Sequence, residues 1–178
     1  MAPKRIMFIR HAEKPHEPPC ENDEGVKKSG ESDKESLTVR GWQRAGALAH
    51  FFSSQLPVRP NVIFASGIGT DSKSHRPKQT VTPLAELIKM DVNTNHLKND
   101  LNPLIEDVRK QTGTVLVAWE HQLIPDLVGE LPNAPAVPKK WPDDRFDIVW
   151  VLDADGANWK FSQIPQMLLA GDSSKPIP

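Results

Sequence analysis

The stretch Arg5-Ile6-Met7-Phe8-Ile9 is an apolar run of strand length, and the polar pair Arg10-His11 follows it directly. A strand with one solvated face alternates apolar and polar residues, and this run does not alternate. It therefore predicts a strand that is buried on both faces, as in a parallel sheet that is covered by helices.

Further strands and helices alternate along the rest of the chain. Apolar runs predict strands at residues 61–65, 114–119 and 147–152. Apolar residues at helical spacing predict helices from Thr38 to Phe52, from Pro77 to Ile88, from Pro103 to about Lys110 and from about Gln122 to Leu131. This alternation predicts a three-layer α/β/α sandwich around a mostly parallel central sheet.

Local signals refine these elements. Thr38 predicts an N-cap, and Asn102-Pro103 predicts an N-cap followed by proline at the first helical position. Pro83 predicts a kink inside its helix. Near the end of the chain, Asp153-Ala154-Asp155-Gly156 predicts a turn, and the alternation over residues 158–162 predicts a half-buried edge strand in a hairpin.

Length and composition narrow the class of protein. The 178 residues fall within the range of about 100–200 that one domain holds, so we expect a single domain over residues 1–178. Two long loops are expected, at residues 12–36 and 132–146, and seven of the 17 prolines fall in them. With 22 Lys and Arg against 23 Asp and Glu, no basic field exists to recruit nucleic acid or an anionic membrane.

The sequence also predicts the compartment. The longest apolar run, Val115 to Trp119, is far shorter than the roughly 20 residues of a membrane-spanning helix. The N-terminal residues lead directly into the first predicted strand, so we expect no signal peptide. Cys20 is the only cysteine, which excludes an intramolecular disulfide and a cysteine-based metal cluster. A cytoplasmic protein is therefore expected.

Polar residues follow three of the predicted strands, where ligands of such sheets bind. The first strand is followed by Arg10-His11, the second by a polar loop that ends in His75-Arg76, and the third by Glu120-His121. Because the carboxyl ends of parallel strands meet at one edge of the sheet, we expect two histidines and two arginines to converge there.

These residue types suit a phosphoryl group. A neutral imidazole can attack phosphorus near neutral pH, because its ordinary pKa is about 6.5. Guanidinium groups match phosphate oxygens with paired donors and stabilise charge on them in the transition state. The glycine-rich loop that cradles nucleotide phosphates is not present in the sequence.

Four motifs in the same order resemble the histidine phosphatase superfamily, which includes the cofactor-dependent phosphoglycerate mutases and the phosphohistidine phosphatases. Phe8-Ile9-Arg10-His11-Ala12-Glu13 is similar to its Arg-His-Gly-Glu signature. Leu37-Thr38-Val39-Arg40-Gly41-Trp42-Gln43-Arg44-Ala45 resembles its Leu-Thr-x-x-Gly-x-x-Gln-Ala helix start. His75-Arg76-Pro77-Lys78-Gln79-Thr80 resembles its Arg-Ala-x-Gln-Thr segment, and Val115-Leu116-Val117-Ala118-Trp119-Glu120-His121 resembles the strand before its second histidine.

The resemblance implies a role for each matched residue. His11 would be the nucleophile that becomes phosphohistidine, and Arg10, Arg76 and His121 would hold the phosphoryl oxygens. Two departures stand out: Ala12 replaces the usual glycine, and Glu-His-Gln replaces the usual residues around the second histidine. The implied reaction is phosphomonoester hydrolysis of a small phosphorylated substrate, with no metal and no cofactor.

Three carboxylic acids are candidates for the general acid that protonates the leaving oxygen. Asp100 follows a possible third strand, near the place where mutase-like members keep their acid. Glu120 adjoins His121, but it reaches the pocket only if the strand has already ended there, because successive strand residues point to opposite faces. Glu13 is a third option that the resemblance does not favour.

Other functions also fit part of the pattern. A non-catalytic module could bind phosphorylated ligands in the same pocket, and a phosphomutase would need a cap for which the 45 residues between Arg76 and His121 leave little room. A metal site built from His11, His16 and Cys20, with Glu13 and Glu17 nearby, lacks the regular spacing of a helical site. Hydrolysis is therefore the predicted activity.

Overall fold

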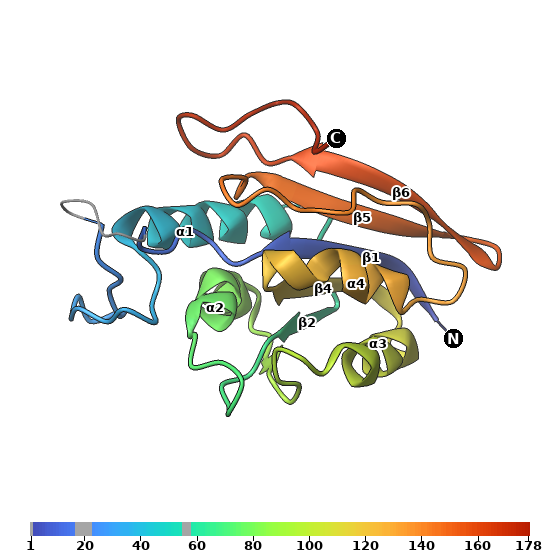
Figure 1. Ribbon diagram of the computed structural model, residues 1–178, viewed down its shortest axis with the longest axis horizontal. Helices are drawn as coiled ribbons and strands as arrows, with labels where there is room; N and C mark the ends of the chain where they lie inside the picture. Colours follow the sequence, from blue (N-terminus) through green and yellow to red (C-terminus); the bar gives the residue numbers. More distant parts are fainter. Residues whose placement is uncertain (1, 17–22, 55–57) are drawn as a thin grey trace.

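A six-stranded sheet with the strand order β3-β2-β4-β1-β5-β6 forms the centre of the molecule (Figure 1). The structure is a computed structural model that describes residues 2–16, 23–54 and 58–178. The strands are β1 (Pro3–Arg10), β2 (Val62–Ala65), β3 (Val92–Asn93), β4 (Gly113–Trp119), β5 (Ile148–Asp155) and β6 (Asn158–Pro165). Strands β1 to β4 run parallel to one another. Strand β5 is antiparallel to β1 and forms an antiparallel hairpin with β6.

Helices cover both faces of this sheet. The helices α1 (Val39–Ser53) and α2 (Arg76–Ile88) pack on one face, and α3 (Leu101–Lys110) and α4 (Ile124–Gly129) pack on the other. A short 3-10 helix, His121–Leu123, precedes α4. The three-layer α/β/α sandwich, its mostly parallel sheet and the edge hairpin are confirmed.

The apolar run in β1 is continuous because both of its faces are buried. Ile6 and Phe8 pack in the cluster that contains the apolar residues of α3 and α4. Met7 and Ile9 pack in the cluster that contains those of α1 and α2. All four side chains are fully buried, and burial of an apolar side chain of this size contributes about 1.5–3 kcal/mol. The two apolar clusters therefore hold β1 in the middle of the sheet.

Thr38 starts α1 as predicted. Its side chain accepts a hydrogen bond from the backbone N–H of Gly41 at 3.1 Å, which satisfies one of the first free donors of the helix. The helix then buries the stripe Ala45, Leu48, Ala49 and Phe52. In α2, Pro83 lies in the interior, and the helix continues past it to Ile88.

Three predicted element boundaries are wrong. Helix α3 begins at Leu101, with Asp100 at the N-cap position, so Pro103 is its third residue; this is still tolerated, because the first four N–H groups of a helix have no internal partner. The helix predicted from 122 to 131 is split, since Pro125 fits only the first turn of an α-helix, and it ends at Gly129. The predicted turn at 153–156 is shorter, because β5 continues to Asp155 and Gly156 turns with a φ of 62°.

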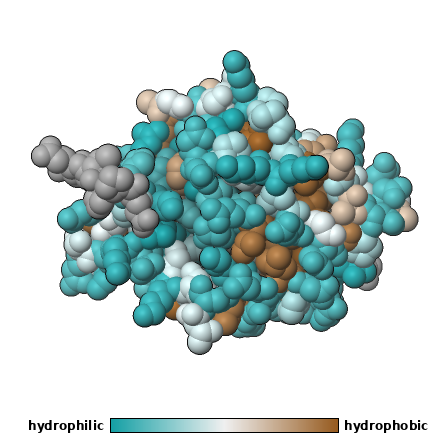
Figure 2. All heavy atoms as spheres, viewed as in Figure 1, coloured by the Kyte–Doolittle hydropathy of each residue, from teal (hydrophilic) through white to brown (hydrophobic). Residues whose placement is uncertain are grey.

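On the face that Figure 2 shows, the described residues are mainly hydrophilic. Figure 2 shows apolar residues on one face only in a few separate patches. Among the described parts of the chain, no helix is both long and apolar enough to cross a membrane.

Candidate active site

The adjacent parallel strands β1 and β4 end side by side and carry four polar residues to one place. Arg10 is in register with Trp119, and the backbone N–H of His11 donates to the carbonyl of Trp119 at 3.1 Å. Glu120 and His121 follow Trp119 directly, so they lie beside His11. The imidazole rings of His11 and His121 are 6.3 Å apart between centroids, edge to face, and both side chains are almost fully buried.

A hydrogen bond to the backbone determines which nitrogen of His11 carries the proton. Its Nδ1 lies 2.7 Å from the carbonyl oxygen of Ala12, which can only accept, so Nδ1 carries the proton and donates. The lone pair is then on Nε2, which is buried and has no hydrogen-bond partner in the described part of the chain. Burial, followed by the charge of Arg10, lowers the pKa of His11, so the ring is neutral at pH 7. The Nε2 lone pair is therefore available to a bound group.

Asp143 binds His121 through Nε2, whereas the ring of His11 is held through Nδ1. The Nε2 of His121 lies 2.6 Å from Oδ1 of Asp143, and this hydrogen bond lowers the pKa of the Asp143 carboxyl. The Nδ1 of His121 is buried and without a hydrogen-bond partner among the described residues. Burial lowers the pKa of His121, while the Asp143 carboxylate opposes that shift. A bound anion at Nδ1 acts in the same direction as Asp143, because it favours the imidazolium form.

The Arg10 guanidinium is held from one side by the loop before β5. Its Nη1 donates to the backbone carbonyls of Pro142, Asp143 and Arg145, and its Cζ lies 3.7 Å from the ring centroid of Phe146. Burial lowers the pKa of Arg10 to about 10, so it stays charged at neutral pH. The remaining nitrogens, Nε and Nη2, are buried without a partner in the parts of the chain that the structure describes.

The Glu120 carboxylate lies between the two imidazoles. Its Oε1 is 3.9 Å from Nε2 of His11 and 3.7 Å from Nδ1 of His121. Strand β4 ends at Trp119, so the alternation that would turn Glu120 away no longer applies. Its interaction with His11 lowers the pKa of Glu120 to about 2, so the carboxylate is ionised in the empty pocket.

Unpartnered nitrogens mark the position of a ligand. Over residues 2–16, 23–54 and 58–178, six buried side-chain polar atoms lack a hydrogen-bond partner, and four of them belong to this group. The four are Nε and Nη2 of Arg10, Nε2 of His11 and Nδ1 of His121. Because an unsatisfied buried polar group costs about 1–3 kcal/mol, such a concentration indicates a bound group. Nε and Nη2 of Arg10 offer donors to its acceptor oxygens, Nδ1 of His121 donates when that ring is protonated, and Nε2 of His11 offers a lone pair. A tetrahedral oxyanion such as a phosphoryl group has that chemistry.

The other predicted site residues have different partners. The Arg76 guanidinium donates to the backbone carbonyls of Lys34 and Ser36, and its Nη2 lies 3.9 Å from the Glu35 carboxylate. The Asp100 carboxylate accepts from the backbone N–H of Leu97 at 2.7 Å, at the start of α3. Through these contacts, Arg76 binds the loop over residues 34–36, and the Asp100 carboxylate binds the backbone just before α3.

Glu13 belongs to a buried ion network. Nη2 of Arg44 lies 2.8 Å from Oε1 of Glu13 and 2.8 Å from Oδ1 of Asp172, and Nη1 donates to Gln166. The Asp172 carboxylate in turn accepts from the backbone of the last segment of the chain. Glu13 therefore links the loop after His11 to α1 and to the segment after β6.

Ala12 fits its position without backbone strain. Among the described residues other than glycine, a positive φ occurs at Lys89, Asn133 and Met167 only, so the backbone of Ala12 is ordinary. Its N–H donates to the hydroxyl of Thr80 at 2.8 Å, which ties the loop after β1 to α2. The substitution of the usual glycine is thus tolerated by the turn.

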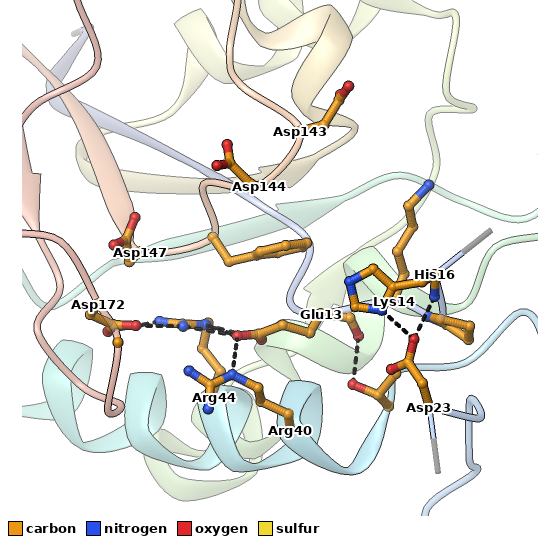
Figure 3. A pocket seen from close by; sticks show the side chains of 14 residues that line it. Glu13, Lys14, His16, Asp23, Arg40, Arg44, Asp143, Asp144, Asp147 and Asp172 are labelled. Carbon is orange, nitrogen blue, oxygen red and sulfur yellow. Dashed lines mark hydrogen bonds and ion pairs between the residues drawn. The ribbon is translucent and has the colours of Figure 1, made fainter. Parts of the chain in front are cut away.

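A cavity of about 540 Å³, whose lining residues are drawn in Figure 3, lies next to residues that contact the buried group. It shares Asp143 and Phe146 with the site, since Asp143 binds His121 and Phe146 packs on Arg10. The remaining lining residues are Glu13, Lys14, Pro15, His16, Asp23, Thr38, Arg40, Arg44, Asp144, Asp147, Gly171 and Asp172. A ligand whose anionic end reaches Arg10 has room here for the rest of its structure.

Asp143 and Phe146 are site residues that the sequence reasoning missed. Asp143 lies in the predicted loop over residues 132–146, 22 residues away from His121, and Phe146 is the last residue of that loop. The alternative metal string of His11, His16 and Cys20 falls partly outside the described residues. His16 is mostly exposed and pairs with Asp23, and Cys20 and Glu17 lie outside the described residues.

Comparison with known proteins agrees with the fold. The sequence matches no protein-family model and no curated protein. Among solved structures, one similar protein is YhfR of Bacillus stearothermophilus, with a TM-score of 0.56 and 13% identity over 96% of this chain and 98% of that one. The α-ribazole phosphatase of Shigella flexneri has a TM-score of 0.55 and 13% identity over 89% of this chain and 94% of its own.

A third similar structure is SixA of Agrobacterium tumefaciens, provisionally described as a phosphohistidine phosphatase. It has a TM-score of 0.52 and 20% identity, covering 90% of this chain and 96% of that one. The chain has the fold of these proteins.

Proposed function

We propose that this chain is a histidine phosphatase that hydrolyses a small phosphomonoester through a phosphohistidine on His11. The observation that carries the proposal is the group of four unpartnered buried nitrogens on Arg10, His11 and His121. Their number and chemistry suit the oxygens of a phosphoryl group, with the lone pair of His11 Nε2 directed at phosphorus. The adjoining cavity takes the leaving group.

The first step transfers the phosphoryl group to the protein. Arg10 Nε and Nη2, together with the imidazolium form of His121, donate to the phosphoryl oxygens and stabilise their charge in the transition state. His11 Nε2 attacks phosphorus, an N–P bond forms, and the P–O bond to the leaving group breaks. Arg10 and His121 supply the positive charge, so the step needs no metal ion.

Glu120 protonates the leaving oxygen. Its carboxyl is ionised in the empty pocket, but the charge of an arriving phosphoryl group raises its pKa, because like charges disfavour ionisation. The group that takes up a proton on binding can then give it to the leaving oxygen. In the second step, the Glu120 carboxylate accepts a proton from water, the water attacks phosphorus, and the N–P bond breaks to release inorganic phosphate.

Phosphate release and a covalent intermediate test the proposal together. The purified protein is incubated with a panel of phosphomonoesters, and inorganic phosphate is measured. A labelled substrate is quenched in alkaline denaturant, where phosphohistidine persists, and the label is located by peptide mapping. We expect turnover and label on His11. Tight phosphate binding without turnover on any panel member would instead identify a phospho-ligand binding module.

The acid limb of the pH profile is expected to have its midpoint below 6.5. The nucleophile must be neutral, and burial together with Arg10 lowers the pKa of His11. Activity therefore persists as the pH falls through 6.5, the ordinary value, and is lost only when the pH reaches the lower pKa of the folded protein. The measurement is kcat/KM from about pH 4 to about pH 9, corrected for the second ionisation of the substrate. A midpoint at or above the ordinary value contradicts this assignment.

Asp143→Asn is expected to reduce kcat/KM by about 10–100-fold. Asparagine can still accept from Nε2 of His121, but without its negative charge it no longer favours the imidazolium form that donates to the phosphoryl group. The matched control is Asp155→Asn, which makes the same change at an exposed carboxylate of the β5–β6 hairpin. An equal loss in both variants would assign the effect to general destabilisation.

A further inference from the structure

The buried residues at the ends of β1 and β4 also have the side-chain types that bind a metal ion. His11, His121 and Glu120 each direct one metal-ligating atom to the same space, and these three atoms lie within 4.8 Å of one another. We propose that this centre binds a divalent transition metal ion, with Zn²⁺ as the probe, and that the bound metal inhibits the enzyme. The inhibition rests on the proposed phosphatase function, whereas the metal binding does not.

The ligand atoms are close to the separation that zinc requires. With bonds of about 2.0–2.1 Å, the ligands of a tetrahedral zinc ion lie roughly 3.3 Å apart. Oε1 of Glu120 is 3.7 Å from Nδ1 of His121 and 3.9 Å from Nε2 of His11. A shift of about 0.5 Å in the partly exposed Glu120 side chain brings these two separations to that value. The two imidazole nitrogens lie within 4.8 Å of each other, so the rings must also move together when the metal binds.

Hydrogen bonds on the far side of each ring leave the required lone pairs free. A metal-binding histidine almost always donates its other N–H to a carboxylate or a carbonyl oxygen, which fixes the tautomer and the ring orientation. His11 makes this bond through Nδ1 to the carbonyl of Ala12, and His121 makes it through Nε2 to the Asp143 carboxylate. Both free nitrogens are buried and have no hydrogen-bond partner in the described part of the chain. The two rings are thus oriented as metal ligands.

The local charge also favours a cation in the empty pocket. Glu120 and Asp143 contribute two carboxylates, which outnumber the one guanidinium of Arg10 that opposes a cation here. Two imidazoles and one carboxylate leave the fourth position of a tetrahedral ion open for water. Metal on Nε2 of His11 occupies the lone pair that attacks phosphorus, so metal and substrate exclude each other. Zinc is therefore expected to inhibit in competition with the phosphomonoester.

Metal binding is measured directly, without reference to turnover. Zn²⁺ is titrated into the full chain against a chromophoric chelator, and Co²⁺ replaces it to record the absorption of a tetrahedral site. All proteins carry Cys20→Ser, because a thiolate is itself a zinc ligand. We expect one Zn²⁺ per chain. Glu120→Gln is expected to bind it at least about 100-fold more weakly, because the loss of a group that only supports a ligand already lowers metal affinity by about 10–100-fold.

A second imidazole–carboxylate pair provides the control. His96 Nε2 lies 2.8 Å from the Asp107 carboxylate, and this pair is not part of the proposed site. His96→Gln removes the pair, and zinc binding is expected to be unchanged. If Glu120→Gln binds zinc as the parent does, or if His96→Gln loses it, the proposed site is wrong. The protein could bind zinc in a way that depends on Glu120 and yet show no phosphatase activity. That result would overturn the proposed function and the inhibition, whereas the metal site would stand. Inhibition that phosphomonoester does not relieve would overturn the competition.

Discussion

His11→Ala is expected to lower kcat for phosphate release by roughly 10⁴-fold or more, as the loss of a covalent nucleophile does in other enzymes. Nε2 of His11 is the atom that would bond to phosphorus, and its removal leaves water to attack the ester directly. Binding of inorganic phosphate is expected to change by less than about tenfold, because Arg10 and His121 keep their donors. Steady-state turnover of an aryl phosphate and phosphate binding by calorimetry measure the two effects separately.

Two further variants separate chemistry from folding. His11→Gln keeps a polar side chain of similar length but has no lone pair able to attack phosphorus, so it is expected to be as inactive as the alanine variant. His50→Gln makes the same change at an exposed position of α1 and is expected to keep full activity. Turnover at the parent rate in either His11 variant would exclude the phosphohistidine mechanism.

Glu120→Gln is expected to lower kcat by about 10²–10⁴-fold on alkyl phosphates. An alkoxide is a poor leaving group, so its departure depends on a proton from Glu120, and glutamine cannot supply one. The loss is expected to be much smaller on an aryl phosphate with an acidic phenol, since that oxygen leaves without a proton. The measurement is kcat for a series of esters plotted against the pKa of the leaving alcohol, which is expected to be steeper in the variant.

Asp100→Asn is the comparison that distinguishes the two candidate acids. The Asp100 carboxylate accepts from the backbone of Leu97 at the start of α3, so its loss is expected to leave kcat within about threefold and to lower stability by about 1 kcal/mol. If Asp100→Asn shows the dependence on the leaving group and Glu120→Gln does not, Asp100 is the acid.

The fold and the centre of the site follow from local sequence patterns. A continuous apolar run specifies a strand buried on both faces, and the residue after such a strand lies at the sheet edge where ligands bind. That rule predicted that Arg10, His11, Arg76 and His121 lie at one edge, without any knowledge of their contacts. The position of Glu120 depended on where β4 ends, and the break after Trp119 turns its carboxylate into the pocket.

Loop residues could not be predicted in the same way. The contact of Asp143 with His121, and that of Phe146 with Arg10, depend on how an irregular proline-rich loop lies across the sheet edge, and no periodicity encodes that path. Similarly, the direction of the Arg76 guanidinium is decided by carbonyl groups of residues 34 and 36, which the sequence near Arg76 does not contain. Helix starts differed by one or two residues wherever a proline was compatible with more than one position of the first turn.

The ion network around Arg44 bears on how the protein is made. Glu13, Arg44 and Asp172 are distant in the chain, yet their side chains meet within 2.8 Å contacts. During synthesis, the first strand and α1 leave the ribosome long before Asp172 does, so Arg44 has only one of its two carboxylates until then. The loop that follows His11 is therefore tied through Arg44 to the segment after β6 only once residue 172 has emerged.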